Sequence, residues 1–446
     1  MHSPLAALAA VFLFTVPALA SAVTFETVPT PNPNPERTLL RGISGSSAAD
    51  VWAVGDYRVT DVLDRHLILH WDGHSWSETA APQVNDAEHM FFNVSVLTPD
   101  LAWAAGLYAE GAGLASGYIL RWDGTRWALD FNHPGWAIFD IRAIGPNDVW
   151  AVGINNDPLA RPPLALHWDG SSWTRIDPPV VGNRNQELDA VHASATDNVW
   201  AVGSYRNITS LAYLAYVVRW NGSRWDHVPL ETPPNVWPVD VWTFGPNDTW
   251  VATDVGSVYH WSGSGWTEHA ISAGSFAGVS RNDLYGLGNN TVQHWDGNVW
   301  TPVQELGLSY PAFRNAAAIL PDGSIWGAGR TIEPNGDMRS LTVRSGGAPV
   351  VSGVDETSQG FFRVSAALPN PFRHETELYL SLERAEPVSI IAYDVHGRSV
   401  ATLHEGPLPA GFHRFRLQAG GLPSGLYLIR SSVGGRIAVR RALLVR

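Results

Sequence analysis

Apolar and polar residues alternate along this chain in short runs, and turn-forming residues separate one run from the next. Alternation with a period of two predicts β-strands, and no stretch shows a helical pattern. One segment near the middle shows the order clearly, with a Gly-Pro-Asn-Asp turn after its first run and an Asp-Gly turn before its last. It predicts four antiparallel strands at Ile141–Ile144, Val149–Gly153, Leu164–Trp168 and Trp173–Ile176.

The four-strand segment recurs along the chain, and two aromatic anchors mark each copy. The first anchor follows a turn, and successive first anchors are 51, 47, 50, 50, 35 and 41 residues apart: Trp52, Trp103, Trp150, Trp200, Trp250, Tyr285 and Trp326. The second anchor opens a Trp-Asp-Gly-x-x-Trp box, in which Asn221 and Ser262 twice replace the Asp: Trp71, Trp122, Trp168, Trp220, Trp261 and Trp295. Four strands per copy at this spacing predict the blades of a β-propeller.

The last copy, residues 316–344, provides three strands but no Trp box. Its missing outer strand is expected from the other end of the chain, because Thr24–Pro29 resembles the fourth-strand segments of the other copies. Pairing of the two ends leaves no open sheet edge. The sequence therefore predicts an all-β chain in which the N-terminal strand closes a seven-bladed propeller.

Most Trp and several His residues occupy repeat positions, and this favours a structural role for them. Eighteen of the 21 Trp residues belong to the anchors or the boxes, where packing between blades is the expectation and a Trp-lined sugar site the alternative. Four His precede box Trp residues in different blades, and Arg121 and Arg219 take the same place in two others. These His are expected to be spread around the ring, so neither a metal site nor a cofactor is predicted: His70, His167, His260 and His294.

Residues 31–346 resemble Trp-rich bacterial propellers built from Val-Trp-Ala-Val-Gly and Trp-Asp-Gly-x-x-Trp repeats, as in Asp50–Gly55 followed by Leu69–Trp76. This resemblance implies a scaffold used for many functions and assigns no site. The box is also similar to the Ser-x-Asp-x-Gly-x-x-Trp box of sialidases. Here, however, Asp72 and Gly73 are adjacent, and the Tyr/Glu pair and Arg triad of sialidases are not found.

Composition and charge narrow the cellular context. The chain has 29 basic residues, all of them Arg, against 42 acidic residues, and it has no Cys. Such an acidic chain is a poor nucleic-acid binder, and without Cys it forms no disulfide. Within residues 1–22, the apolar run Leu5–Leu19 and the small residues Ala18, Ala20 and Ala22 predict a cleaved secretory signal peptide. A membrane anchor is the alternative, but the run is short for a span. Export is expected, with no transmembrane segment after signal removal.

Residues 364–446 differ from the rest in charge, being net positive while the remainder is net negative. The expected organisation is a signal peptide at 1–22, a propeller at 23–350, a linker at 351–363 and a C-terminal domain at 364–446. Short motifs recur in order along this last segment: Asn370, Pro371, Phe372, Tyr393, Asp394, Gly397, Arg398, Gly411, Gly425 and Tyr427.

These motifs resemble the C-terminal sorting domain (type A) of type IX secretion substrates, a small immunoglobulin-like β-sandwich. The resemblance implies recognition by the outer-membrane secretion machinery, and display at the cell surface or release. The alternative is a module that only spaces the propeller.

The candidate ligand site lies at the channel mouth of the propeller, on the face with the longer connections. Four connections are expected to be long loops: Asp56–Arg65, Tyr108–Ser116, Asn155–Pro163 and Tyr205–Ala212. Trp136, Trp237 and Trp242 lie outside the repeat pattern, and the first two precede inner strands. The candidate binding residues are therefore Trp136, Trp237, Phe313, Tyr57, Tyr205, Arg206 and Asp254, with mutual packing of the aromatic rings as the alternative.

The predicted function is an exported, non-enzymatic binding or adhesion module for an extracellular glycan or protein. The alternative is a polysaccharide-active hydrolase or lyase that uses carboxylates at the same mouth, such as Asp56, Glu110, Asp157, Glu187 and Asp254. No local motif marks any of these as catalytic. A purely structural surface-layer component is a third possibility.

Overall fold

The computed structural model describes residues 23–60, 63–83, 88–109, 115–157, 161–182, 184–288, 290–306, 316–346, 362–364, 372–382, 385–394, 398–409, 411–434 and 436–445. The signal-peptide prediction at 1–22 lies outside these residues. The described part of the chain is all β-structure, with no helix. Accordingly, no described helix is long and apolar enough to cross a membrane.

Strands β1 to β28 form four-stranded antiparallel sheets whose order follows the chain. The first three sheets run from inner to outer strand as β2 (Thr38–Ser47), β3 (Asp50–Thr60), β4 (Leu63–Trp71) and β5 (Trp76–Glu78); β6 (Glu88–Thr98), β7 (Leu101–Ala109), β8 (Ser116–Trp122) and β9 (Trp127–Pro134); and β10 (Trp136–Gly145), β11 (Asp148–Asn155), β12 (Pro163–Trp168) and β13 (Trp173–Arg175).

The next three sheets repeat this order with shorter outer strands. They are β14 (Arg184–Ala195), β15 (Asn198–Arg206), β16 (Tyr213–Trp220) and β17 (Trp225–His227); β18 (Pro238–Gly245), β19 (Asp248–Thr253), β20 (Val258–Trp261) and β21 (Trp266–His269); and β22 (Ser275–Ser280), β23 (Asp283–Leu287), β24 (Thr291–Trp295) and β25 (Trp300–Glu305).

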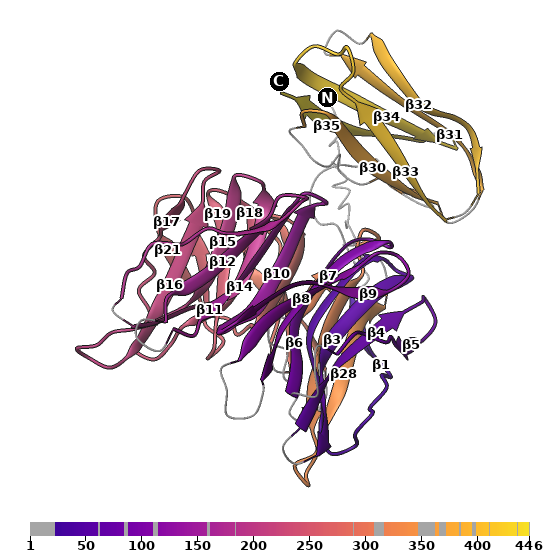
Figure 1. The fold of residues 1–446 in the computed structure, drawn as a ribbon. Helices are drawn as coiled ribbons and strands as arrows, with labels where there is room; N and C mark the ends of the chain where they lie inside the picture. The colour runs from indigo at the N-terminus through magenta and orange to yellow at the C-terminus, as the bar shows by residue number, and fades with distance from the viewer. Residues whose placement is uncertain are drawn as a thin grey trace, which may run out of the picture.

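One further sheet contains strands from both ends of the segment 24–346. It contains β26 (Ala317–Ile319), β27 (Ile325–Ile332), β28 (Met338–Gly346) and, outermost, β1 (Thr24–Val28). The pairing of β1 with β28 runs from Thr24 opposite Gly346 to Val28 opposite Thr342. Figure 1 shows the orange strand β28 beside the indigo strand β1.

The inner strands pack against one another from sheet to sheet, and the hydrophobic core lies between the sheets. Inner strands β2, β6, β10, β14, β18, β22 and β26 contact each other in that order, and β26 also contacts β2. One core cluster, for example, combines Trp52 and Ile68 of the first sheet with Phe91 and Tyr118 of the second. Sheets of this kind that pack face to face around their inner strands form a β-propeller.

The Trp-Asp-Gly-x-x-Trp box is the tight turn that was expected between the third and fourth strands. In the first copy Asp72 Oδ1 accepts hydrogen bonds from the backbone N–H of His74 and Ser75, both at 2.8 Å, and Gly73 has φ of 96°. Only glycine adopts this backbone conformation without strain. In the third copy, donation from the Ser171 hydroxyl and from backbone N–H groups lowers the pKa of Asp169 to about 2.

The strands differ from the sequence-based expectation at the end opposite the box. The first strand of the third sheet begins at Trp136 rather than Ile141. The connection expected as a long loop over Asp56–Arg65 is mostly a hairpin, because Tyr57 pairs with Arg65 and Arg58 with Asp64. The antiparallel ladder therefore extends beyond the expected strand ends, with one irregularity between Arg58 and Thr60.

Residues 362–445 form two further antiparallel sheets around a shared core. One contains β29 (Phe362–Val364), β30 (Glu375–Leu382) and β33 (Gly411–Gln418); the other contains β31 (Glu386–Asp394), β32 (Ser399–Leu408), β34 (Gly425–Val433) and β35 (Arg436–Leu444). Leu378 and Leu380 of the first sheet share one apolar cluster with Ile390 and Ile429 of the second. This arrangement is a small β-sandwich.

Candidate functional site

The propeller has two ends that differ in chemistry. We call the lower rim the end where the first strand of a sheet turns into the second and the third into the fourth. We call the upper rim the opposite end, which holds the connections from second to third strand and from one sheet to the next. The box turns lie on the lower rim, and the predicted binding residues that the structure describes lie on the upper rim.

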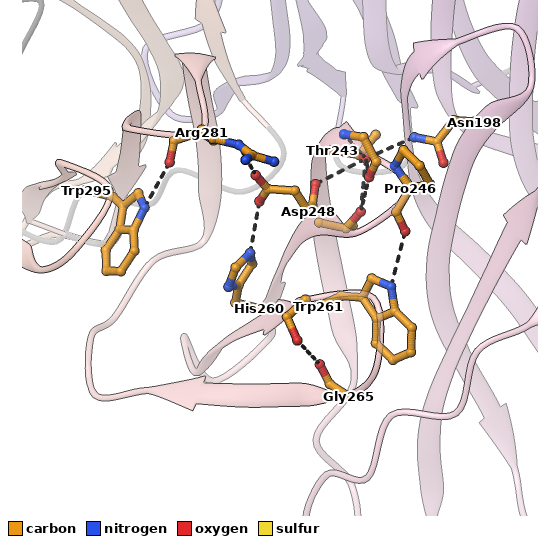
Figure 2. A network of polar contacts seen from close by, with 12 residues as sticks. Asn198, Thr243, Pro246, Asp248, His260, Trp261, Gly265, Arg281 and Trp295 are labelled. Carbon is orange, nitrogen blue, oxygen red and sulfur yellow. Dashed lines mark hydrogen bonds and ion pairs between the residues drawn. The ribbon is translucent and has the colours of Figure 1, made fainter. Parts of the chain in front are cut away.

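The lower rim is a repeated network of structural contacts. Figure 2 shows Asp248 between His260, at 2.9 Å from Oδ1, and Arg281 of the next sheet, at 3.3 Å from Oδ2. The indole N–H of Trp261 donates to the carbonyl oxygen of Pro246 at 3.2 Å. Equivalent Asp–His pairs recur in other sheets at 2.8, 2.9 and 2.7 Å: Asp50–His70, Asp148–His167 and Asp283–His294.

The repeat Trp and His side chains pack on one another beneath these contacts. Trp250 is fully buried, stacks on His260 with ring centroids 4.1 Å apart and meets Trp295 at 5.1 Å. Packing of this kind is the scaffold role expected for the repeat residues. Among the residues that the structure describes, no group of three His, Cys, Asp or Glu side chains is placed to hold a metal ion.

A β-bulge near the upper rim distinguishes five of the inner strands. In each, the pairing register skips one residue, which lies 11 residues before the first anchor of its copy: Arg41, Phe92, Phe139, Asp189 and Val239. A bulged residue is left out of the hydrogen-bond ladder and is re-aimed relative to its neighbours. The same repeat position therefore presents five different side chains from the inner strands.

The bulged residues of the first three sheets contact each other across sheet boundaries. The guanidinium of Arg41 lies 5.4 Å from the centre of the Phe92 ring. The rings of Phe92 and Phe139 meet edge to face at 5.3 Å. In the fourth sheet the equivalent residue is Asp189. The bulge position therefore carries a cationic or aromatic side chain in the first three sheets and a carboxylate in the fourth.

The residues that follow the bulges connect neighbouring inner strands. Asp140 Oδ2 accepts a hydrogen bond from the backbone N–H of Val191 at 2.6 Å, and its other oxygen accepts from the Asn93 amide. Asp240 Oδ2 accepts from the N–H of Phe276 at 2.8 Å. Burial raises the pKa of Asp140 to about 6 and that of Asp240 to about 8.

Trp242, the third Trp outside the repeat pattern, lies within this inner layer. It is 8% exposed and stacks on His192 with ring centroids 4.2 Å apart. The guanidinium of Arg142 lies 5.9 Å from the Trp242 ring. His192 Nδ1 accepts a hydrogen bond from the backbone N–H of Thr243 at 3.2 Å, which links the fourth sheet to the fifth.

Three carboxylates from two neighbouring sheets come together at the upper rim. Glu187 and Asp189 belong to β14, and Asp254 directly follows β19. Glu187 Oε1 accepts from the Ser204 hydroxyl at 3.1 Å, and Asp254 Oδ1 accepts from the backbone N–H of Trp237 at 3.1 Å. Asp189 Oδ2 is buried and has no hydrogen-bond partner among the residues that the structure describes. Burial, followed by the charges of Glu187 and Asp254, raises the pKa of Asp189 well above its usual range.

Backbone strain and exposed apolar side chains occur at the same rim. The described non-glycine residues with positive φ all lie at the upper rim of the third to fifth sheets, Asn185 at the start of β14 and the other three on connections: Arg161 (46°), Asn185 (50°), Leu211 (60°) and Asn235 (63°). Such conformations are costly and concentrate at functional sites. Aliphatic side chains on these connections are more than half exposed: Val180 (65%), Ile208 (51%), Leu211 (61%) and Val255 (61%).

The predicted binding residues that the structure describes lie at this rim, and their aromatic side chains do not form one ring. Trp237 contacts Tyr213 at 5.7 Å, and its backbone exchanges two hydrogen bonds with Asp254. Trp136 instead stacks on His133 at 3.6 Å and lies 5.7 Å from the guanidinium of Arg175, beside outer strands. No ring contact joins these two Trp residues within the described part of the chain.

The remaining predicted residues have local partners. Tyr57 packs against the core between the first sheet and the β26–β28 sheet, and burial raises its pKa. Tyr205 meets Tyr216 at 6.5 Å, and Arg206 Nε donates to the carbonyl oxygen of Leu211 at 3.5 Å. Phe313 lies outside the described residues. Sequence reasoning missed Phe92, Phe139 and Asp189, although their constant distance from the first anchor was a usable signal.

Most described motif residues of the C-terminal sandwich have structural contacts. Phe372 is 1% exposed, and Tyr427 donates from its hydroxyl to the carbonyl oxygen of Pro423 at 2.6 Å. Arg398 forms an ion pair with Asp394 at 2.7 Å. Tyr393, Gly411 and Gly425 lie in paired strands, whereas Asn370, Pro371 and Gly397 fall outside the described residues.

Comparison with known proteins yields weak structural similarities. No family model and no curated protein matches the chain. A structure of YCF48 bound to D1 peptide is 14% identical and covers 73% of this chain and 95% of its own, with a TM-score of 0.48. PorZ, a surface component of the type IX secretion system of Porphyromonas gingivalis, is 14% identical and covers 91% and 59%, with a TM-score of 0.37.

A third similar structure is an enzyme. A fungal alcohol oxidase of the AA5 family in complex with copper is 11% identical and covers 94% of this chain and 99% of its own, with a TM-score of 0.49. Similarities at this level transfer no site residue and no activity to the present chain. The functional argument therefore rests on the geometry of the upper rim.

Proposed function

We propose that this chain is an exported, non-enzymatic binding module that holds an extracellular protein on the upper rim of a closed, seven-bladed propeller. The pairing of β1 with β28 and the contact of β26 with β2 support closure of the ring. The C-terminal β-sandwich, residues 364–446, serves in this proposal as a sorting domain for secretion. The predicted signal peptide at residues 1–22 begins the same route.

The observation that carries the proposal is the convergence at the upper rim of the third to fifth sheets. Three features meet there: a carboxylate cluster, exposed aliphatic side chains and connections with strained backbone. Function concentrates on irregular connections held by a rigid scaffold. Elsewhere the repeat residues pack in the core or form the recurring Asp–His pairs.

The same geometry favours a protein ligand over a glycan. Sugars bind aromatic rings through an open face, but Trp136 is stacked on His133 and lies beside Arg175. The large apolar side chains that are exposed at the rim are aliphatic, as in Ile208 and Val255. Aliphatic contacts combined with charged groups suit a peptide segment better than a carbohydrate.

One observation favours the alternative function, a polysaccharide-active hydrolase. Burial raises the pKa of Glu187, which is the direction that a general acid requires. If this alternative holds, the purified chain releases reducing ends from a polysaccharide panel and Glu187→Gln abolishes the release. The binding proposal expects no release by either protein.

The binding proposal is tested with residues 23–446 immobilised and screened against random displayed peptides and a polysaccharide panel. The test variant Ile208→Asp/Val255→Asp places charges on the upper rim. We expect it to weaken binding of selected peptides at least tenfold, because both side chains are exposed and lie at the proposed interface.

The matched control places the same charges on the lower rim. Val279→Asp/Val299→Asp alters side chains that are 51% and 54% exposed, and it should leave binding unchanged. Equal melting temperatures of the two variants exclude unfolding as the cause. Selection of polysaccharides alone, or loss of binding only in the lower-rim variant, contradicts the proposal.

A further inference from the structure

We infer that Glu187, Asp189 and Asp254 form a subsite for the basic side chain of a partner protein, an arginine or lysine inserted at the upper rim. This inference rests on the proposed function and specifies the chemistry of its ligand. It starts from the β-bulge of β14, which takes Asp189 out of the strand ladder. At the equivalent position the neighbouring sheets present Phe139 and Val239.

The clearest sign of a missing partner is Asp189 itself. Its Oδ2 atom is buried, yet neither it nor any other side-chain atom of Asp189 has a hydrogen bond to the described residues. A buried carboxylate oxygen without a donor is unfavourable, and native proteins rarely retain one without a functional reason. Asp140 and Asp240, in comparison, accept backbone N–H groups of the neighbouring inner strand.

The two other carboxylates are already oriented by the protein. Glu187 is held by the Ser204 hydroxyl and Asp254 by the backbone N–H of Trp237, and each keeps acceptor capacity for a further donor. Their charges act on Asp189 from two different sheets. Arg161 is the cation whose charge acts on Glu187, but no ion pair joins it to any of the three within the described residues. An incoming cation would therefore supply what the cluster lacks.

The spacing of the cluster favours an organic cation over a metal ion. The described residues contain no group of three acidic or histidine side chains placed to bind one metal. A guanidinium carries five N–H donors on a planar fork and an ammonium carries three, so both can serve several carboxylates without sharing one coordination point. Ile208, Leu211 and Val255 are exposed on the neighbouring connections and are available to the residues that flank the basic side chain.

The test uses synthetic pentapeptide mixtures with random flanks and a fixed central arginine, lysine, citrulline or norleucine. Citrulline has the shape of arginine without its charge. Residues 23–446 are immobilised, and the retained peptide is measured by mass spectrometry. We expect at least tenfold more retention of the arginine and lysine mixtures than of the neutral mixtures, and a decrease in this preference with added salt.

Substitutions assign the preference to the cluster. Asp189→Asn should abolish the preference for arginine and lysine mixtures over neutral ones, and Glu187→Gln should reduce it. Both variants should keep the melting temperature of the wild type. Asp197→Asn, an exposed residue in the lower-rim turn of the same sheet, should leave the preference unchanged. If Asp189→Asn does not fold, Glu187→Gln alone tests whether the charge preference depends on the cluster: a reduced preference supports the subsite and an unchanged one contradicts it.

The outcomes separate this inference from the proposed function. If arginine and citrulline mixtures are retained equally, the subsite for a basic side chain is contradicted. If Ile208→Asp/Val255→Asp also weakens retention of both mixtures, the proposed protein-binding function of the upper rim is still supported. A charge preference that Asp197→Asn removes and Asp189→Asn does not also overturns the subsite. No retention of any mixture overturns both.

Discussion

The lower and upper rims of the propeller are built from the same strands but follow different rules. On the lower rim, one contact pattern recurs from sheet to sheet, as in Asp50–His70 and Asp248–His260. On the upper rim, one repeat position carries Arg41, Phe92 or Asp189. The comparison teaches that repetition marks the scaffold here, and that the candidate site lies where equivalent positions stop sharing chemistry.

The largest expected effect tests the pairing of β1 with β28, on which the closed ring of sheets, and so both rims, would depend. Deleting residues 23–30 removes β1, whose side chains Phe25 and Val28 are 6% and 8% exposed, and opens the edge of β28. Loss of this burial and of the strand pairing should cost at least about 5 kcal/mol, seen as a sharp decrease in melting temperature. Glu26→Ala is the control, because its ion pair with Arg344 is solvent-exposed and should contribute less than about 1 kcal/mol. An unchanged melting temperature after the deletion would rule out closure by β1.

The second prediction compares one Trp from each rim. Trp250 is fully buried against Trp295 and Trp300, so Trp250→Ala should lower the free energy of unfolding by about 3–5 kcal/mol. Trp237 is half-buried at the upper rim with one ring contact, and Trp237→Ala should cost only about 1 kcal/mol. Urea denaturation measures both. Equal losses would remove the distinction between scaffold and site.

The third prediction concerns the buried carboxylates of the inner strands. Burial raises the pKa of Asp240 to about 8, so the folded protein retains a proton that the unfolded chain releases near pH 4. Stability from this group is therefore fullest at low pH and is lost as the pH rises through 8. In Asp240→Asn the melting temperature should decrease less between pH 5 and pH 8 than in the wild type.

Asp140→Asn provides the matched comparison for this pH dependence. Because the pKa of Asp140 is raised only to about 6, its substitution should flatten the profile below pH 6 and leave the upper part unchanged. Melting curves recorded by circular dichroism across this range are sufficient. Profiles of both variants that coincide with the wild type would show that neither group titrates in this range.

Much of the scaffold followed from the sequence, and the candidate site followed only in part. Asp72 and Gly73 predicted a tight turn because their side-chain and backbone preferences act over neighbouring residues. Tyr57 was expected in a loop, but it lies in a strand because Arg65 pairs with it. The sequence predicted a binding site on the upper rim, and that site stays a prediction. The place of Asp189 was not predicted, because a bulge adds one residue to a strand without a signature in the hydrophobic pattern.

The sequence by itself determined the repeated unit, its turns and the anchors that bury Trp residues between sheets. These depend on alternation and on contacts between residues close in the chain, which a single copy already contains. Only the tertiary structure decided that the charge of Asp254 acts on Asp189, 65 residues away, and that Asp189 Oδ2 has no donor among the described residues. The proximity of these two carboxylates depends on how neighbouring sheets pack around their inner strands. No pattern of residues close together in the chain encodes that packing.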